Sequence, residues 1–285
     1  TVQSMVVWDV RLPRVLLAAV TGAGLAAAGS AYQGIFHNYL VSPDLLGVSN
    51  GAGFGAALGM FLTAGSTRLA GILAFLFGLG SVALTYGISS VKKERSAMTL
   101  VLSGVIVSSV FNALIALIKL AADTDSVLPA ITYWLMGSFT GADYKKCAIA
   151  GCAVVFGGIV LYIMRWRINV LSMGDEEARS LGLNPERERL VIVVASTFIT
   201  AACVTVSGIV GWVGMVMPNI VRRMIGADHR YLIPVSAIGG AVFLMAADLG
   251  ARSISAGEIP VGILTSLVGA PVFVLVFAGK DGKPC

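Results

Sequence analysis

Long apolar runs separated by short polar stretches make up most of the chain. An α-helix needs about 20 apolar residues to cross the hydrocarbon core of a bilayer, and runs near this length recur throughout the sequence. Nine spans are predicted, at 15–36, 51–64, 69–88, 98–122, 148–164, 190–207, 210–221, 233–251 and 259–278. The seventh is interrupted by Pro218, and a kink is expected at Pro271 in the last. The pattern therefore predicts an all-α fold, a polytopic transmembrane helical bundle forming one domain over residues 1–285.

Several polar or proline-containing segments interrupt this pattern at membrane depth. They are residues 38–44, the Pro218-Asn219 pair and residues 258–262, while the run 127–137 is too short to span and is interpreted as re-entrant or interfacial. Non-helical backbone at this depth is tolerated only where it is buried in protein or lines a water-filled path. Broken helices are common along transporter pathways, and tight interhelical turns are the alternative interpretation.

The short second span carries glycine at every fourth position. Gly51, Gly55 and Gly59 leave one helix face without side chains, which favours close approach of a neighbouring helix in lipid. The span is expected to begin a little before residue 51, with Ser49 or Asn50 as its N-cap. This pattern indicates a tight bundle, but it does not by itself indicate transport.

Lysine and arginine placement predicts the orientation of the spans. One set of alternating loops holds 13 basic residues: Lys92, Lys93, Arg95, Arg165, Arg167, Arg179, Arg187, Arg189, Arg222, Arg223, Arg230, Lys280 and Lys283. The other set holds six: Arg11, Arg14, Arg68, Lys145, Lys146 and Arg252. Because cytoplasmic loops carry the excess of positive charge, the first set is predicted to be cytoplasmic, and so is the C-terminus.

Composition supports a membrane protein and excludes some other classes. The chain is 57% hydrophobic and only 12% charged, and its net charge of +5 is interpreted as cytosolic loop charge, not as a nucleic-acid-binding surface. The four cysteines, Cys147, Cys152, Cys203 and Cys285, have neither the spacing of a metal site nor that of a disulfide framework. They are interpreted as packing residues in the membrane.

Motifs for catalysis and for ATP binding are absent from the sequence. It contains no Walker A loop and no His-Glu-x-x-His motif, and both histidines, His37 and His229, fall in predicted cytoplasmic loops. Asp248 and Lys119 lie near span ends, so the span interiors have almost no ionisable residue of the kind that couples transport to an ion gradient. An intramembrane enzyme and an ion-coupled carrier are thus both disfavoured. A transporter of this composition needs a partner that supplies energy.

The largest hydrophilic stretch, residues 165–189, stands apart from the rest of the chain. Its three consecutive acids, at 175–177, suit the first turn of a short helix, which Ser172 could cap and Asn184-Pro185 would end. From the pattern alone, the stretch is either a solvated connector or a docking surface for a soluble partner.

Motifs along the whole chain resemble one family of permeases. They are RLPR at 11–14, DLLGVSNG at 44–51, YWLMG at 133–137, GDEEARSLG at 174–182, GWVG at 211–214 with Pro218, DHR at 228–230, ADLGAR at 247–252, EIPVG at 258–262 and GAPVF at 269–273. In this order they resemble the permease subunit of type II ABC importers, which carry iron complexes, haem or cobalamin. The motifs identify the family but not its cargo.

The resemblance implies a permease with no catalytic, cofactor or metal site of its own. Such a subunit has about ten helices, of which the first is expected to lie ahead of Thr1. It forms a homodimer with the pathway on the dimer axis, in the cytoplasmic membrane of a bacterium or archaeon. Two ATPase subunits, which hold the ATP and Mg²⁺, dock on the cytoplasmic face, and a substrate-binding protein docks outside.

Site residues follow from the resemblance position by position. The coupling helix that contacts the ATPase corresponds to Gly174, Asp175, Glu176, Glu177, Ala178, Arg179, Ser180, Leu181, Gly182 and Leu183. The external arginines that pair with acids on the binding protein correspond to Arg11, Arg14 and Arg252. The cytoplasmic gates correspond to Asn38 and Leu40, and to Ser96, Ala97 and Met98.

The chain also departs from the family pattern. The family usually has proline where this chain has Tyr39, and often histidine where it has Asn219. At the second gate Ala97 and Met98 replace the small hydroxyl residues of the cobalamin permease, which argues against cobalamin as cargo. We therefore expect alternating-access import of a ferric siderophore or haem. Cobalamin and a molybdate-type oxyanion are the alternatives within the family, and an ion-coupled secondary transporter is the alternative outside it.

Overall fold

The computed structural model describes residues 2–91, 97–254 and 258–278, and within these ranges every regular element is a helix. In chain order the elements are α1 (Val2–Met5), the π-helix η1 (Val6–Arg11), α2 (Leu12–Ile35), the 3₁₀-helix η2 (Pro43–Leu46), α3 (Val48–Leu62), α4 (Thr67–Ser89), α5 (Ala97–Ala121), α6 (Val127–Leu135), α7 (Tyr144–Leu171), α8 (Asp175–Ser180), α9 (Pro185–Ser207), α10 (Val213–Ile225), α11 (His229–Ile254) and α12 (Val261–Ala278). The predicted all-α fold is confirmed.

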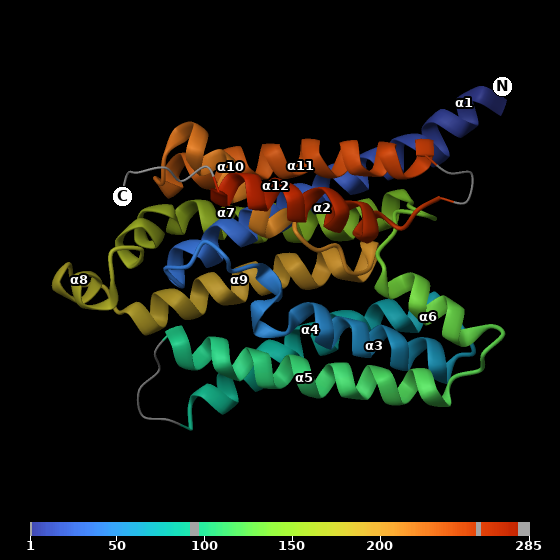
Figure 1. Ribbon diagram of the computed structural model, residues 1–285, viewed down its shortest axis with the longest axis horizontal. Coiled ribbons are helices and arrows are strands. Elements are labelled where there is room, and N and C mark those ends of the chain that lie inside the picture. The colour runs from blue at the N-terminus through green and yellow to red at the C-terminus, as the bar shows by residue number, and fades with distance from the viewer. Residues whose placement is uncertain (1, 92–96, 255–257, 279–285) are drawn as a thin grey trace.

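The long helices lie side by side in one elongated bundle (Figure 1). α8 stands at one end of the bundle, and α6 lies toward the opposite end, where the chain begins; we call these the α8 end and the α6 end. α2 packs against α7, α9, α10 and α11, while α3, α4 and α5 pack on one another. α2 and α9 are the most enclosed helices, since 72% of their most apolar stretches is buried, against 28–33% in the other long spans.

Six of the described helices are long and apolar enough to cross a membrane: Val6–Ile35, Thr67–Ser89, Ala97–Ala121, Tyr144–Leu171, Pro185–Ser207 and His229–Ile254. All six correspond to predicted spans. The other three predicted spans are the shorter helices α3, α10 and α12. The run 127–137, predicted to be too short to span, contains the nine-residue helix α6 and closes at Gly137.

Several predicted boundaries were wrong. α7 continues past residue 164 to Leu171, and α9 begins at Pro185, so the predicted hydrophilic stretch 165–189 contracts to a connector over 172–184. The charged residues that suggested a loop instead extend α7 beyond its apolar part, where Ile168 is fully buried and Arg167 pairs with Glu188 of α9 at 2.8 Å. His229 is not in a loop either. It is buried at the start of α11, where its backbone N–H donates to Asn169 Oδ1 at 2.8 Å.

The predicted break at Pro218-Asn219 does not occur. α10 runs unbroken from Val213 to Ile225, with Pro218 inside it. A proline removes one intrahelical hydrogen bond, and Asn219 adds one locally by donating from Nδ2 to the carbonyl of Met215 at 2.8 Å. α12 likewise continues through Pro271.

The glycine face of α3 packs directly on a neighbouring helix, as predicted, and the structure shows that this helix is α4. A Cβ added at Gly51 would lie 2.5 Å from Phe77 O, and one at Gly55 would lie 2.2 Å from Leu73 O. α3 does begin before residue 51, but its N-cap is Gly47, and neither Ser49 nor Asn50 caps it. The Ser49 hydroxyl instead donates to the Asp44 carboxylate in η2.

Gly55→Ala is expected to separate α3 from α4 and to lower the Tm of the purified protein. Overpacking of this kind costs about 1–3 kcal/mol. Gly80→Ala in α4 is the matched control, because nothing lies within 4 Å of its added Cβ. An equal Tm for the two variants in a thermal unfolding experiment would contradict this packing.

Candidate functional site

The predicted coupling segment forms a short helix at the end of the bundle. α8 comprises Asp175–Ser180 and carries three acids in its first turn, where they complement the partial positive charge of the helix N-terminus. Its N-cap is Gly174, with no side-chain cap, so the predicted Ser172 cap was wrong; the Ser172 hydroxyl donates back to Asn169 O at 2.6 Å. The helix ends at Ser180, with Leu181 as its C-cap, before the left-handed Gly182.

Asn184-Pro185 starts the next helix and does not end α8. Asn184 caps α9 by accepting a hydrogen bond from the backbone N–H of Arg187 at 3.2 Å, and Pro185 is the first residue of that helix. A proline suits the first turn of a helix, where its missing N–H would have no intrahelical partner. Asn184-Pro185 was therefore correctly predicted to mark a helix boundary, but that boundary is the start of α9 and not the end of α8.

α8 is anchored to the bundle on one side only. Ala178 is fully buried, and Asp175 Oδ1 pairs with Nη2 of the buried Arg189 at 2.6 Å. The other side of α8 is exposed and presents Glu176, Glu177 and, just beyond the helix, Leu181, which is 56% exposed. The helix therefore combines a fixed position with an exposed acidic and apolar surface. Figure 1 shows α8 projecting beyond the ends of the neighbouring helices.

The two predicted gates lie toward the α8 end (Figure 1). Asn38 and Leu40 are exposed in the non-helical segment between α2 and η2. Ala97 and Met98 open α5, with Met98 64% exposed, while Ser96 lies outside the described residues. Their role as gates stays a prediction.

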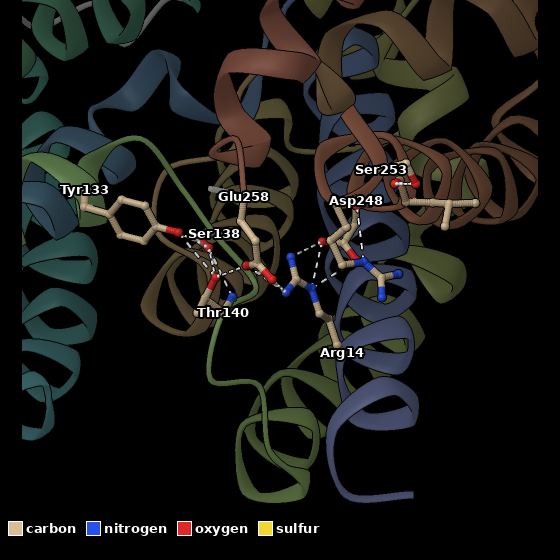
Figure 2. A network of polar contacts seen from close by, with 9 residues as sticks. Arg14, Tyr133, Ser138, Thr140, Asp248, Ser253 and Glu258 are labelled. Carbon is tan, nitrogen blue, oxygen red and sulfur yellow. Dashed lines mark hydrogen bonds and ion pairs between the residues drawn. The ribbon is translucent and has the colours of Figure 1, made fainter. Parts of the chain in front are cut away.

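An ionic network around Arg14 lies toward the α6 end (Figure 1 and Figure 2), buried at Arg14 and Asp248 and partly exposed at Glu258. The Arg14 guanidinium donates from Nε to Asp248 Oδ1 at 3.0 Å and from Nη1 to both Glu258 oxygens at 3.0 Å. Arg252 also pairs with Asp248, at 3.2 Å, and Thr140 donates to Glu258 at 2.8 Å. The network thus joins α2, α11, the segment before α12 and the connector between α6 and α7.

Arg14 is therefore not available for the docking contact that was predicted for it. The residue is only 7% exposed, and two carboxylates of its own chain occupy its guanidinium. Arg11 is exposed, and the Arg252 side chain is 24% exposed. A docking role for these two residues stays a prediction.

The network also explains the acids at this end of the bundle. Asp248 is 1% exposed and lies between two arginines, so it is a compensated buried charge. The hydrogen bond from Thr140, together with the Arg14 guanidinium, holds the pKa of Glu258 below its ordinary value. Glu258 therefore stabilises the fold above its ordinary pKa, and this contribution is lost as the pH falls through its lowered value.

Sequence reasoning missed the residues that hold these sites in place. Asp248 was noticed only as an acid near a span end, and its partner Arg14 lies 234 positions away in the chain. Gln33 of α2, and Asn219 and Arg222 of α10, contact the segment that contains the first predicted gate, residues 37–42. The available signal was that Tyr39 and Asn219 both depart from the family pattern.

Comparison with known proteins gives matches over nearly the whole chain. The family model described as the FecCD transport family matches residues 1–278. The chain is 40% identical over 284 residues to the molybdate import system permease of Haemophilus influenzae, covering 99% of this chain and 83% of that protein. It is 36% identical over 274 residues to the hemin transport system permease of Yersinia pestis, covering 94% and 82%.

Solved structures agree with this result. A chain assigned to the metal-chelate type of ABC transporter, in an inward-facing conformation, matches with a TM-score of 0.93 and 38% identity, covering 97% of this chain and 88% of that one. A second solved structure, PsaBC of Streptococcus pneumoniae in complex with a Fab, matches with a TM-score of 0.62 at 18% identity, which supports the fold alone.

Proposed function

Because the chain belongs to the FecCD transport family, we propose that it carries a metal complex, a ferric siderophore or haem, across the cytoplasmic membrane by alternating access. The chain is a non-catalytic, multi-pass permease subunit of an ABC importer. A permease of this family works with a separate ATPase and a substrate-binding protein. ATP and Mg²⁺ belong to the ATPase subunits in this proposal.

The exposed surface of α8 is the observation that carries the mechanism. Its acids and Leu181 would dock in the ATPase, and the Asp175–Arg189 ion pair would pass movement of the ATPase into α9, one of the two most enclosed helices. The excess of basic residues in the loops at this end supports a cytoplasmic location for it.

A homodimer would place the pathway between two copies of this chain. Leu40 and Met98 are exposed apolar side chains at the predicted gates, and a second copy at a dimer axis would cover them. Substrate-binding-protein docking is assigned to the opposite, α6 end, where Arg11 is exposed and Arg252, which pairs with Asp248, is partly exposed. Such charges would steer docking and fix its register.

A molybdate-type oxyanion is the second candidate cargo. It is favoured by the 40% identity to the permease named for molybdate import in Haemophilus influenzae. Relatives named for iron chelatin, at 39% identity, and for hemin, at 36% identity, favour the metal complex.

Uptake experiments would decide between these cargoes. Cells that express the complete importer and lack other uptake routes would be given radiolabelled ferric siderophore, haem, cobalamin or molybdate. Uptake of the iron complex or haem, not reduced by excess molybdate, is the expected result. Uptake of molybdate alone would replace the proposed cargo with the oxyanion.

A further inference from the structure

The first gate segment, residues 37–42, has little structure of its own. The Asn38 side chain accepts a hydrogen bond from Leu40 N at 2.9 Å, and its carbonyl accepts one from Val41 N at 3.2 Å. These local bonds shape the turn, and at its start His37 contacts α7 through a hydrogen bond between its Nε2 and the carbonyl of Leu171. Val41 is nevertheless only 3% exposed, so contacts from elsewhere must hold the segment in place.

Asn219 of α10 supplies the first of these contacts. Its Nδ2 donates to the carbonyl of Tyr39 at 2.8 Å and to Met215 O at 2.8 Å, while its Oδ1 accepts from Arg222 Nη1 at 2.8 Å. Every polar group of the amide is thus used in one consistent orientation. Asn219 is buried, so an unpaired amide there would be costly.

Arg222, one turn further along α10, supplies the second contact. Its guanidinium lies over the Tyr39 ring, with Cζ 4.1 Å from the ring centroid, and Nη2 donates to Gln33 Oε1 at 2.8 Å. Its hydrogen-bond acceptors are the neutral amides of Asn219 and Gln33, and it forms no ion pair in the described part of the chain. The planar cation is therefore used to stack on the ring and to bridge two helices, which lysine could not reproduce.

The two helices that make these contacts, α2 and α10, also pack on each other. Gln33 Nε2 donates to Met215 O of α10 at 3.1 Å and to Val41 O of the gate segment at 3.5 Å. Elsewhere in the same interface the backbones of α2 and α10 are in direct contact, since a Cβ added at Gly29 would lie 1.8 Å from Gly214 O. The gate segment is thus bound to two helices that are already packed on each other.

We propose that Gln33, Asn219 and Arg222 form a clasp, in which these positioning residues hold the gate segment on α10 so that it moves with that helix. This inference rests on the proposed function only in treating residues 38 and 40 as a gate. It also gives one reason for two departures from the family pattern, because Tyr39 and Asn219 are direct partners.

Labelling of a buried cysteine in the gate segment tests the clasp directly. The test protein carries Val41→Cys, has Cys147, Cys152 and Cys285 replaced by serine, and keeps Cys203, which is fully buried in α9, as a reporter of the global fold. Purified protein is treated with a maleimide, and the two labelled sites are separated by mass spectrometry.

Arg222→Gln and Asn219→Ala are each expected to raise the labelling rate at position 41 about tenfold, as expected for loss of a hydrogen bond that involves a charged group. Labelling of Cys203 should stay slow. The matched control is Arg223→Gln, since Arg223 is the exposed neighbour on α10. Unchanged labelling at position 41 in both clasp variants would overturn the proposal.

Two further variants separate stacking from charge. Arg222→Lys should label as fast as Arg222→Gln, and wild-type labelling of Arg222→Lys would overturn the clasp geometry. Arg222→Gln should raise the labelling rate by a smaller factor in a Tyr39→Ala background than in the wild-type background, because the ring on which Arg222 stacks is already missing. The same factor in both backgrounds would contradict the contact between Arg222 and Tyr39. Raised labelling with normal ATP-driven uptake would support the clasp and refute the gate role of residues 38 and 40, while the proposed function would stand.

Discussion

Arg14→Ala is expected to lower the free energy of unfolding by about 3–5 kcal/mol, the cost of removing one partner from a buried ion pair. The substitution would leave Asp248, which is 1% exposed, with only the longer contact to Arg252 at 3.2 Å. It would also release Glu258 and so free the segment before α12. A marked fall in the Tm of the detergent-purified protein is the measurement.

Arg11→Ala provides the matched control for this change. It removes the same side chain one turn earlier, from an exposed position, and is expected to change stability by no more than about 0.5 kcal/mol. Arg14→Lys should recover only part of the loss, because one ammonium group cannot donate to both carboxylates in the same fork geometry. A Tm for Arg14→Ala equal to that of Arg11→Ala would contradict the structural role of the network.

Replacing Glu176 and Glu177 together with lysine is expected to reduce cargo uptake at least about tenfold, by preventing assembly with the ATPase or by uncoupling ATP hydrolysis from transport. Both side chains are exposed on α8, so their reversal changes the docking surface without disturbing the buried Ala178 or the Asp175–Arg189 pair. The two substitutions also remove favourable charge–dipole interactions at the N-terminus of α8, which costs about 0.3–1 kcal/mol for each charge.

Asp125→Lys is the control for the charge reversal. Asp125 is exposed in the connector between α5 and α6, at the end opposite α8, and its reversal should leave copurification with the ATPase unchanged. Wild-type uptake by the α8 double variant would reject the coupling assignment. Comparable loss of copurification in both variants would show that the effect is not specific to α8.

The six long spans could be predicted because membrane hydrocarbon imposes one rule on every segment that crosses it. A segment must be apolar over a known length, and local composition contains that information. Close packing of one face of α3 was also predictable, since Gly51, Gly55 and Gly59 lie on the same side of the helix, but its partner α4 was not. The short helix α8 could be predicted because its three acids suit the partial positive charge at the N-terminus of a helix.

Contacts between distant parts of the chain could not be predicted in this way. Arg14 looked like an exposed charge next to a span, and only the fold brings Asp248 and Glu258 to it. The charges of Arg165 and Arg167 suggested a loop, whereas α7 continues through both residues. Pro218 suggested a break, but α10 absorbs it with side-chain hydrogen bonding from Asn219.

The energy source of transport is the most direct test of the central claim. Cargo uptake would be measured in right-side-out vesicles that contain the complete importer, with ATP trapped inside and the proton and sodium gradients collapsed by ionophores. The proposed function predicts that uptake continues and that it stops when ATP is omitted. Uptake that requires an ion gradient and proceeds without ATP would contradict it and would identify the protein as an ion-coupled carrier.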